Sequence, residues 1–465
     1  MRIVPTGMSA PLARTPWPVL YGCRVVSLRE RFGPAIYMGG GLALVGAAGY
    51  GFVALAGHTL PPVEAAALGV VYLMVNIIGP GVFSALEQET SRAVSAEAAA
   101  GRGIGSVGRH AWLLAFGLLA ALLVVLLAIS PILTNSALAG QWGLLLAVLL
   151  SVMTSAAVYV VRGLLGGTQR FTGYSATLAA EGLARILPCL LIFVIGVPNS
   201  VGYALIFAAG SGFGAVAGLF WLRREVTAPV APVVSPAPTA NTVKQMARSL
   251  SLLVGGTLLM LVVMNVAPIV VTGRLTEAAA ATAAAFTSAF VLARIPLFLF
   301  APVQAMLLPS LTRAAETHDF AAVRAKLRLI LLAVLAIGLP ALLASFTIGP
   351  WAVQVLFGAD VRLSGAVVGL LGVSTIGLMV GMVLQPGLVA LGAHKSVTAA
   401  WLAGTVVLVA LLALPGDPIR AGVIAQLAGS AVAVAIMLRA LSKALHGRSA
   451  PAATPAGSGV ATTPG

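Results

Sequence analysis

The chain contains very little charge. Only 8% of its 465 residues are Asp, Glu, Lys or Arg, against about a quarter in a typical soluble protein. Hydrophobic residues make up 60% of the chain, and the mean hydropathy is +1.05. Because so few charged side chains cannot cover a water-exposed surface of this size, the composition excludes a soluble globular domain. It predicts an all-α polytopic membrane protein.

Cysteine is also scarce, and the usual motifs of soluble enzymes are missing. Cys23 and Cys189 lie in different segments, so we expect no disulfide bond. No Walker A loop is present, and the five histidines do not have the spacing of metal ligands. Gly103, Gly105 and Gly108 lie in a loop with no preceding strand, which argues against a dinucleotide site. We therefore expect neither enzymatic activity nor a cofactor.

Twelve apolar segments are long enough to cross a membrane, since a span requires about 20 residues. The first is of spanning length and is followed at once by another, so we expect no cleavable signal peptide. Many of the segments are rich in Gly and Ala, which favours close helix packing in a bilayer. The predicted spans are 35–57, 63–86, 111–131, 143–163, 172–196, 200–221, 249–272, 281–310, 329–349, 364–392, 397–414 and 419–441.

Lysine and arginine are distributed unequally between the two ends of these spans. With the N-terminus in the cytoplasm, the cytoplasmic segments hold 22 of the 27 cationic residues, and the outer loops hold only Arg274, Arg362 and Arg420. Arg162, at the end of span 143–163, is assigned here to a cytoplasmic segment. This bias predicts a multi-pass protein of the inner (plasma) membrane with both termini cytoplasmic. It also explains the net charge of +15 without a nucleic-acid partner.

A Pro/Ala-rich stretch divides the chain into two halves of six spans each. Four prolines within ten residues predict an extended spacer there. Landmarks of the first half recur in the second: Ala209-Gly210-Ser211 matches Ala428-Gly429-Ser430 at an offset of 219 residues. A duplication with the same topology in both copies is a known transporter plan. We predict a cytoplasmic N-terminal segment (1–34), an N-lobe (35–225), the linker (226–248), a C-lobe (249–445) and a disordered cytoplasmic tail (446–465).

Three charged residues fall inside predicted spans. Glu181 and Arg185 are one helical turn apart and can pair, whereas Arg294, about midway along 281–310, has no acidic residue within a turn. Charges at this depth cost about 2.5–3.5 kcal/mol each on insertion scales, so a functional role is the first interpretation. The alternatives are an ion pair that fixes helix register and, for Arg294, pairing with Glu181 or with a backbone carbonyl.

Uncharged polar residues inside the spans are Asn265, Gln304 and Gln385. Hydrogen bonding between helices is the first expectation for them, and lining of a cavity is the second. The run from Leu86 to Arg92 carries two glutamates and an arginine at a membrane edge. It is interpreted either as a solvated helix end or as a latch against basic loops.

Three motifs resemble sequences of the multidrug/oligosaccharidyl-lipid/polysaccharide (MOP) exporter superfamily. Leu86–Arg92 is similar to the Glu-Gln-Glu…Ser-Arg signature of actinobacterial polysaccharide exporters, and Arg294–Phe300 followed by Val303-Gln304-Ala305 resembles their eighth span. Leu356–Asp360 resembles a recurrent loop of the superfamily. The resemblance is to the polysaccharide-biosynthesis or O-antigen flippase (Wzx-like) branch. It implies two six-helix lobes around a central cavity that opens to one side at a time.

The resemblance also implies a substrate, an undecaprenyl-pyrophosphate-linked oligosaccharide or polysaccharide precursor that is moved from the inner to the outer leaflet. Arg185 and Arg294 are then candidate diphosphate contacts, because arginine suits phosphate recognition. Glu181 would tune Arg185 or couple an ion, and Asn265 and Gln304 complete the candidate substrate site. Proton or sodium coupling stays open. Implied partners are the lipid-linked glycan, membrane lipids, and the glycan polymerase and glycosyltransferases of the same pathway.

Other transporters remain as alternatives. A cation-coupled multidrug antiporter of the same superfamily would need acidic residues deep in the spans, where this chain has Glu181. A lipid II flippase usually has two further spans. A major-facilitator transporter usually has a short motif-bearing loop after its second span, whereas this loop runs from about Glu87 to Arg109. A non-transporting scaffold for glycan assembly is the last alternative.

Overall fold

The computed structural model describes residues 28–224, 242–297, 311 and 319–449. Within these residues, twelve helical segments are long and apolar enough to cross a membrane, and each overlaps one of the predicted spans. The part of the chain that is described contains no strand. The predicted all-α polytopic fold is therefore confirmed.

The N-terminal half supplies six spans, of which the second is interrupted by one π-helical turn. Its elements are α1 (Leu28–Thr59), α2 (Pro62–Ile78), η1 (Gly79–Phe83), α3 (Ser84–Ala99), α4 (Gly105–Ala137), α5 (Trp142–Gly167), α6 (Phe171–Ile195) and α7 (Ser200–Arg224).

The C-terminal half supplies the other six spans. Helix α8 begins inside the segment predicted as linker, and the last helix runs slightly into the predicted tail. The elements are α8 (Val243–Arg274), η2 (Glu277–Ala279), α9 (Ala280–Ala293), α11 (Phe320–Thr347), α12 (Gly349–Phe357), α13 (Gly365–Ala390), α14 (His394–Leu412) and α15 (Pro418–Ser449).

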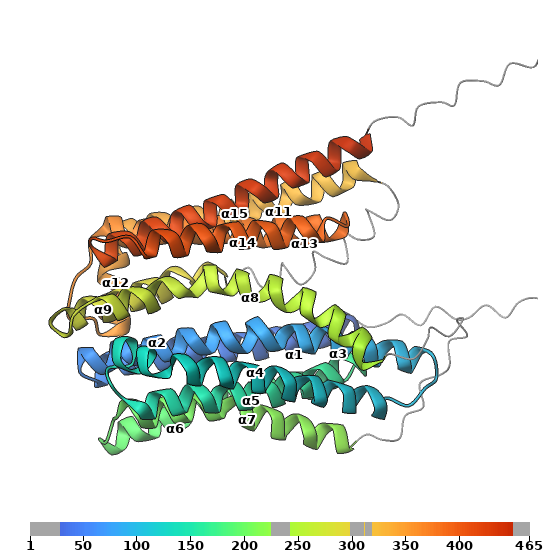
Figure 1. The fold of residues 1–465 in the computed structure, drawn as a ribbon, viewed down its shortest axis with the longest axis horizontal. Coiled ribbons are helices and arrows are strands. Elements are labelled where there is room, and N and C mark those ends of the chain that lie inside the picture. Colours follow the sequence, from blue (N-terminus) through green and yellow to red (C-terminus); the bar gives the residue numbers. More distant parts are fainter. Residues whose placement is uncertain (1–27, 225–241, 298–310, 312–318, 450–465) are drawn as a thin grey trace, which may run out of the picture.

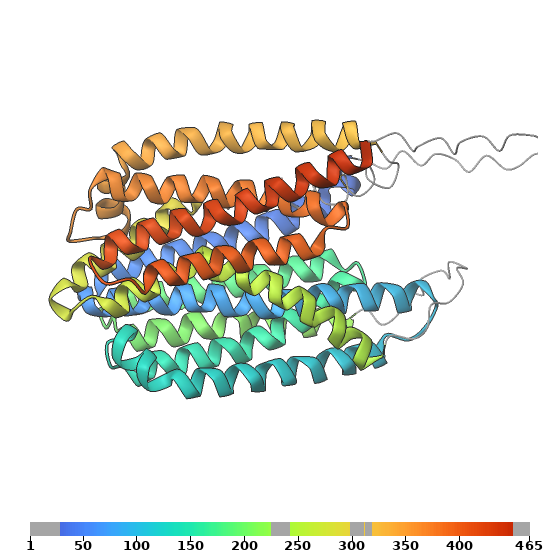
Figure 2. The ribbon, with the colours of Figure 1, turned by 45° about the horizontal axis from the view of Figure 1, so that its top comes forward.

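The two halves form two separate bundles, one from α1–α7 and one from α9–α15, with α8 between them (Figures 1 and 2). Corresponding spans pack in the same pairs in both halves. In the N-lobe α5 packs against α7, α6 against α7, and α1 against α6. In the C-terminal half the matching pairs are α13 with α15, α14 with α15, and α8 with α14. The third and fourth spans also pair in both halves, as α4 with α5 and α11 with α13. This repeated packing is what a duplication of one six-span unit requires.

Helix α8 contacts both bundles. It packs against α14 and α15 of the C-lobe and against α2, η1, α3 and α4 of the N-lobe. The π-helical turn contributes directly, because the Thr257 hydroxyl of α8 donates a hydrogen bond of 2.7 Å to the Gly81 carbonyl of η1. Pro80 lies in this turn, as expected where a proline disturbs the regular ladder of a helix. The lobes are thus joined along α8, and α2 also packs against α9.

Arg274 at the end of α8 ties the loop ends of the C-lobe together. Its guanidinium donates to the carbonyls of Leu412 (2.5 Å) and Leu414 (2.8 Å), which are left open where α14 ends. The sequence placed Arg274 among the few cations of the outer loops. Its contacts show that it is a side-chain cap of a helix C-terminus, the end that the helix dipole makes favourable for a cation.

We expect Arg274→Ala to lower the free energy of unfolding by about 1.5–3 kcal/mol, the usual contribution of hydrogen bonds to a charged group. Arg420→Ala is the matched control, because that side chain is 84% exposed and makes only a 3.5 Å pair with Asp417. Thermal unfolding of the two purified variants in detergent checks the difference. Equal melting temperatures would contradict the capping role of Arg274.

Candidate functional site

A buried ion cluster occupies the interior of the N-lobe. Glu181 of α6 accepts from Arg162 of α5 at 2.5 Å through one oxygen and from Arg185 of α6 at 2.5 Å through the other. The predicted pairing of Glu181 with Arg185 is therefore present. All three residues are at least nine-tenths buried. Two arginines share one carboxylate, which leaves this trio with one net positive charge.

Helix α7 closes the cluster from the other side. The Ser211 hydroxyl donates to Glu181 (2.8 Å) and accepts from Arg185 (3.0 Å). Gly210 makes room for this, since a Cβ there would lie 2.4 Å from Cγ of Arg185. The sequence contained a signal for this contact in Ala209-Gly210-Ser211, which we used only as a landmark of the repeat.

Arg162 is the functional-site residue that sequence reasoning missed. We assigned it to a cytoplasmic segment between spans, whereas the structure places it within a helix. Helix α5 continues to Gly167, so Arg162 lies inside the helix, 5% exposed, where its Nε donates to Thr177 at 2.9 Å. An arginine near the end of an apolar run gives no indication in the sequence of whether it faces a loop or turns inward.

The two glutamates of Leu86–Arg92 are held by partners. The Tyr174 hydroxyl of α6 donates to Glu87 at 2.6 Å, and Arg92 pairs with Glu89 at 2.6 Å. Glu89 is 1% exposed. The interpretation of this run as a solvated helix end is wrong for the buried Glu89, whereas Gln88 and Arg92 are exposed. Instead, α3 packs against α5, and Glu87 links it to α6 next to the ion cluster.

Arg294 lies in a different environment, in the C-lobe. Helix α9 ends at Ala293, and the Arg294 guanidinium donates to the Thr375 hydroxyl of α13 (3.1 Å) and to the Met264 carbonyl of α8 (3.0 Å). It lies over the ring of Phe290, 4.3 Å from the centroid. The side chain is 7% exposed, and its Nε has no hydrogen-bond partner among the described residues.

No carboxylate forms an ion pair with Arg294 in the described part of the chain. Pairing with Glu181, one of the alternatives, does not occur, and the carbonyl contact does. Helix α9, which ends directly before Arg294, packs against α2 and also contacts α1. Because α1 and α2 belong to the N-lobe, Arg294 lies where the two lobes face each other.

Aromatic residues extend from Arg185 toward the interface. Arg185 lies 4.4 Å from the ring centroid of Phe207, which in turn lies 4.3 Å from Phe52 and 5.8 Å from Tyr72. Each lobe thus holds its own arginine, as predicted, but the two have different environments. Arg185 is paired with a carboxylate within its lobe, whereas Arg294 has no carboxylate partner among the described residues.

The remaining candidates are only partly placed. Asn265 of α8, a half-buried residue, donates to the Leu261 carbonyl of its own helix at 3.1 Å, and the described residues offer it no hydrogen bond to another helix. Gln385 does accept a bond from another helix, from the Trp401 indole at 2.9 Å. Gln304 lies outside the described residues.

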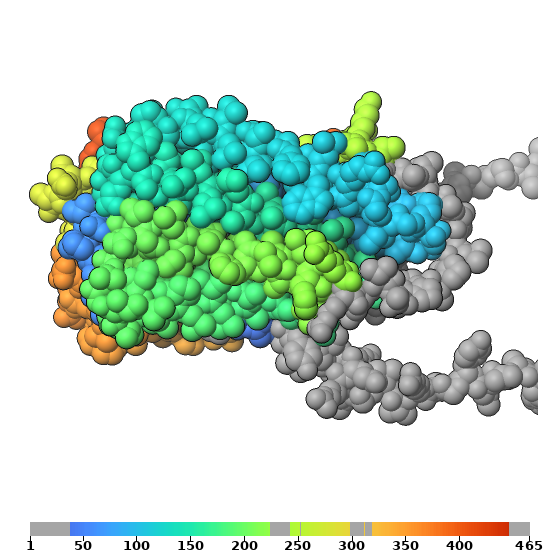
Figure 3. Space-filling view, turned by 90° about the horizontal axis from the view of Figure 1, so that it is seen from below, coloured from blue at the N-terminus to red at the C-terminus, as the bar shows by residue number. Residues whose placement is uncertain are grey.

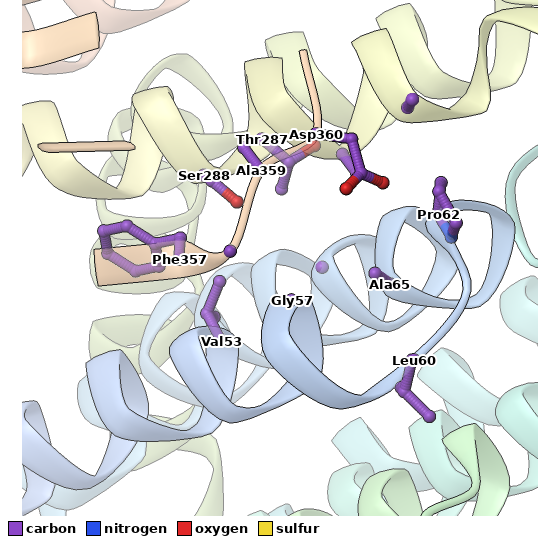
Figure 4. Close-up of a pocket in the computed structure, with 14 residues that line it drawn as sticks. Val53, Gly57, Leu60, Pro62, Ala65, Thr287, Ser288, Phe357, Ala359 and Asp360 are labelled. Carbon is purple, nitrogen blue, oxygen red and sulfur yellow. The ribbon is translucent and has the colours of Figure 1, made fainter. Parts of the chain in front are cut away.

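The lobes also meet at the end of the bundle opposite to the end of α15. Here the loop after α12 lies against the end of α1, and Phe357, Ala359, Asp360, Gly57 and Pro62 surround a pocket of only ≈ 20 Å³ (Figure 4). That volume holds about one water molecule. The loop after α12 and the end of α1 thus leave little space between them, and we name this end of the interface the closed end.

Two glycines make this close approach possible. A Cβ on Gly57 would lie 1.8 Å from the Phe357 carbonyl oxygen, and one on Gly358 would lie 2.6 Å from the Gly57 carbonyl oxygen. Gly358 also has a φ of +63°, a conformation that favours glycine. The loop Leu356–Asp360, quoted above for its resemblance, is thus part of the contact between the lobes.

We expect Gly57→Ala to push the lobes apart at the closed end, because backbone opposes the added methyl group. The measurement is the distance between spin labels at His58→Cys and Glu277→Cys, both exposed, in a Cys23→Ser/Cys189→Ala background. Gly40→Ala on the same helix is the control, since its Cβ would meet nothing within 4 Å. An unchanged distance distribution in the Gly57 variant would contradict this role.

Comparison with known proteins gives both sequence relatives and structural neighbours. No family model matches the chain. The uncharacterized protein Rv3630 of Mycobacterium tuberculosis is 26% identical over 88% of this chain and 92% of its own, and the uncharacterized protein Rv1510 of the same organism is 27% identical with the same coverage.

The structural neighbours are transporters. A multidrug resistance MATE family transporter of the MOP superfamily, in its inward-facing conformation, superposes with a TM-score of 0.67 at 16% identity, over 87% of this chain and 96% of that chain. The outward-facing conformation gives a TM-score of 0.62 at 14% identity, over 90% and 97%. A eukaryotic MATE transporter gives 0.60 at 14%, over 90% and 99%. The chain therefore has the fold of the MATE transporters of the MOP superfamily.

Proposed function

We propose that this protein is an alternating-access flippase that moves an undecaprenyl-pyrophosphate-linked oligosaccharide or polysaccharide precursor from the inner to the outer leaflet of the plasma membrane. The observation that carries the proposal is Arg294. It is a buried cation at the lobe interface, with an unsatisfied Nε and no carboxylate partner among the described residues. A guanidinium in that state is suited to bind a diphosphate, which supplies both charge and hydrogen-bond acceptors.

Two further observations support alternating access. The fold is shared with transporters solved in inward-facing and outward-facing conformations, and the inward-facing one superposes better. At the closed end of this chain, Gly57 and Gly358 allow the lobes to approach closely. With both termini in the cytoplasm, as the distribution of Lys and Arg predicts, the closed end faces outward and this conformation would receive substrate from inside.

The second candidate function is a cation-coupled multidrug antiporter, which the names of the structural neighbours favour. Such a transporter needs a deep carboxylate with oxygen atoms available to a cation. Both oxygens of Glu181 are already engaged by Arg162, Arg185 and Ser211. The chemistry of the site thus favours an anionic substrate, with proton or sodium coupling left to measurement.

Reconstituted protein separates the two functions. Proteoliposomes would carry a fluorescent undecaprenyl-pyrophosphate oligosaccharide, and a membrane-impermeant glycosidase would report how much of it reaches the outer leaflet. The proposal expects protein-dependent translocation and no efflux of a cationic dye under a proton or sodium gradient. Dye efflux without glycan translocation would contradict the flippase function and support the antiporter function. The expected partners are then the polymerase and glycosyltransferases that make and use this glycan.

A further inference from the structure

Pro268 interrupts the hydrogen-bond ladder of α8. In an α-helix each N–H donates to the carbonyl four positions earlier, and a proline has no N–H to donate. The carbonyl of Met264, four positions before Pro268, therefore has no regular backbone partner. Arg294, directly after the end of α9, donates to this carbonyl at 3.0 Å. The guanidinium of the proposed substrate site thus takes the place of the N–H that Pro268 lacks.

The preceding carbonyl of α8 provides an internal comparison. Gln426 of α15, which is 0% exposed, donates to the Val263 carbonyl at 2.9 Å. That carbonyl also has a regular helix partner, the N–H of Ala267. Side chains of two other helices thus reach two consecutive carbonyls of α8. Of these two, only the Met264 carbonyl depends on its side-chain donor.

The part of Arg294 that suits an oxyanion is already half engaged. Arginine often binds a carboxylate or phosphate through two nitrogens at once, and Arg92 binds Glu89 in this way, through Nε at 2.9 Å and Nη2 at 2.6 Å. In Arg294 the Nε has no hydrogen-bond partner among the described residues, whereas Nη2 donates to Met264. A phosphate that binds the same two nitrogens competes with this carbonyl for Nη2. A carbonyl left without a donor inside the helix bundle costs free energy.

Pro268 also separates two attachments of α8. Residues 243–267, before the proline, include Thr257, whose hydroxyl binds the Gly81 carbonyl of the N-lobe. Residues 268–274, after it, end in Arg274, which caps α14 of the C-lobe. Helices α4–α7 cover the N-lobe face seen in Figure 3, so most of α8 is hidden between the lobes (Figures 1 and 3). A change in α8 at Pro268 therefore affects how the lobes are connected.

We propose that Pro268 is a positioning residue of the substrate site, which holds Arg294 through the Met264 carbonyl and makes α8 respond to an anionic ligand. The inference rests on the proposed function, because the ligand is the diphosphate of the lipid-linked substrate. When the diphosphate takes Nη2 of Arg294, the Met264 carbonyl loses its donor. The parts of α8 on either side of Pro268 then change their relative orientation, which couples substrate binding to the position of the lobes.

The distance between the start of α8 and the end of α15 reports this change. Spin labels at Lys244→Cys and Lys443→Cys, both exposed positions, measure it in the full-length protein in nanodiscs. A Cys23→Ser/Cys189→Ala background removes the native cysteines.

The first comparison needs no ligand. Arg294→Ala should shift the distance distribution, because no donor then serves the Met264 carbonyl. Pro268→Ala/Arg294→Ala should not shift it, because the N–H restored at position 268 serves that carbonyl. An unchanged distribution in Arg294→Ala, or an equal shift in the double variant, would overturn the proposal.

The second comparison adds undecaprenyl pyrophosphate, which should shift the distance in the native protein in the same direction as Arg294→Ala. Pro268→Ala should bind this lipid about 5-fold more tightly, since one hydrogen bond is no longer lost on binding. It should also show no shift and slower translocation of the glycan. A substitution that only distorted the site would weaken binding as well. Equal or weaker binding by Pro268→Ala would therefore contradict the positioning role.

Two variants are matched controls. Pro340→Ala restores an N–H in α11 at an exposed proline, and Gln426→Leu removes the donor to the preceding carbonyl of α8, which keeps its regular partner. Neither should change the distance. A shift in Gln426→Leu as large as in Arg294→Ala would overturn the role of Pro268. If the native protein does not bind undecaprenyl pyrophosphate, the proposed function and the coupling fail together, whereas a shift in Arg294→Ala that the double variant lacks still assigns the positioning role to Pro268.

Discussion

Substitution Glu181→Gln is expected to lower the free energy of unfolding by about 3–5 kcal/mol, the cost of leaving a buried charge without its partner. The amide keeps the shape of the carboxylate but removes its charge. Arg162 and Arg185 then lie close together inside the N-lobe, with the hydroxyls of Thr177 and Ser211 as hydrogen-bond partners and no carboxylate paired with either among the described residues. Loss of folded protein, rather than loss of turnover alone, is therefore the expected result.

The molecule contains its own reporter for this measurement. Cys189 lies one turn beyond Arg185 in α6 and is fully buried. In a Cys23→Ser background, a thiol-reactive dye labels it only when the lobe opens, so labelling during heating gives the melting temperature. Glu277→Gln, at an exposed carboxylate, is the matched control. If both variants melt together, the cluster does not stabilise the lobe as its geometry requires.

The charge balance of the cluster allows a further check. Adding Arg162→Gln to Glu181→Gln removes one of the two cations left without a partner. The double variant should regain part of the stability that Glu181→Gln loses, because contacting residues in one network are not additive. A double variant that melts at a lower temperature than Glu181→Gln would show that packing by the Arg162 side chain outweighs its charge.

Arg294→Ala is expected to reduce the initial rate of glycan translocation by at least 30-fold, since truncating one partner of a buried, hydrogen-bonded charge pair costs about 2–5 kcal/mol. Stability should change much less than in Glu181→Gln. Removing Arg294 leaves only the Thr375 hydroxyl and the Met264 carbonyl behind, and no unpaired charge. The two substitutions thus separate a cation that serves transport from a carboxylate that serves folding.

The relative translocation rates of the variants at position 294 identify what the guanidinium contributes. Arg294→Lys keeps the charge but loses the planar fork, so its rate should lie between those of the native protein and the alanine variant. Proteoliposome translocation and the Cys189 melting assay together give the rate and the stability. Full transport activity in a folded Arg294→Ala protein would show that Arg294 does not bind the substrate. Faster dye efflux in that variant would instead indicate a cationic substrate repelled by Arg294.

The spans could be predicted from the sequence because apolar length is a local property. Twelve runs of about 20 residues define twelve helices, and the structure has all of them. Pairs of residues one turn apart on one helix, such as Glu181 and Arg185, could also be predicted. Their spacing fixes a shared face regardless of how the helix packs.

Contacts between helices could not be predicted in the same way. Nothing near Arg162 in the sequence indicates that it reaches Glu181, 19 positions away on another helix. In the sequence, nothing distinguishes Gly57 and Gly358 from other glycines. Their role becomes visible only in the structure, where α1 and the loop after α12 are in contact. The interpretation of Leu86–Arg92 as a solvated helix end failed for the same reason. Its Glu87 accepts a hydrogen bond from Tyr174 of α6, and the sequence does not show how α6 is oriented relative to the second span.

The π-helical turn Gly79–Phe83 sets the rotation of everything that follows it in the second span. A π-turn holds one residue more than an α-turn, and one residue of an α-helix corresponds to about 100°. Without that additional residue, Glu87 would be rotated by about this angle and would not face Tyr174 of α6. The same turn presents the Gly81 carbonyl to Thr257. One additional residue in this turn thus determines the direction in which Glu87 points within the N-lobe. It also determines where α8 is hydrogen-bonded to the second span.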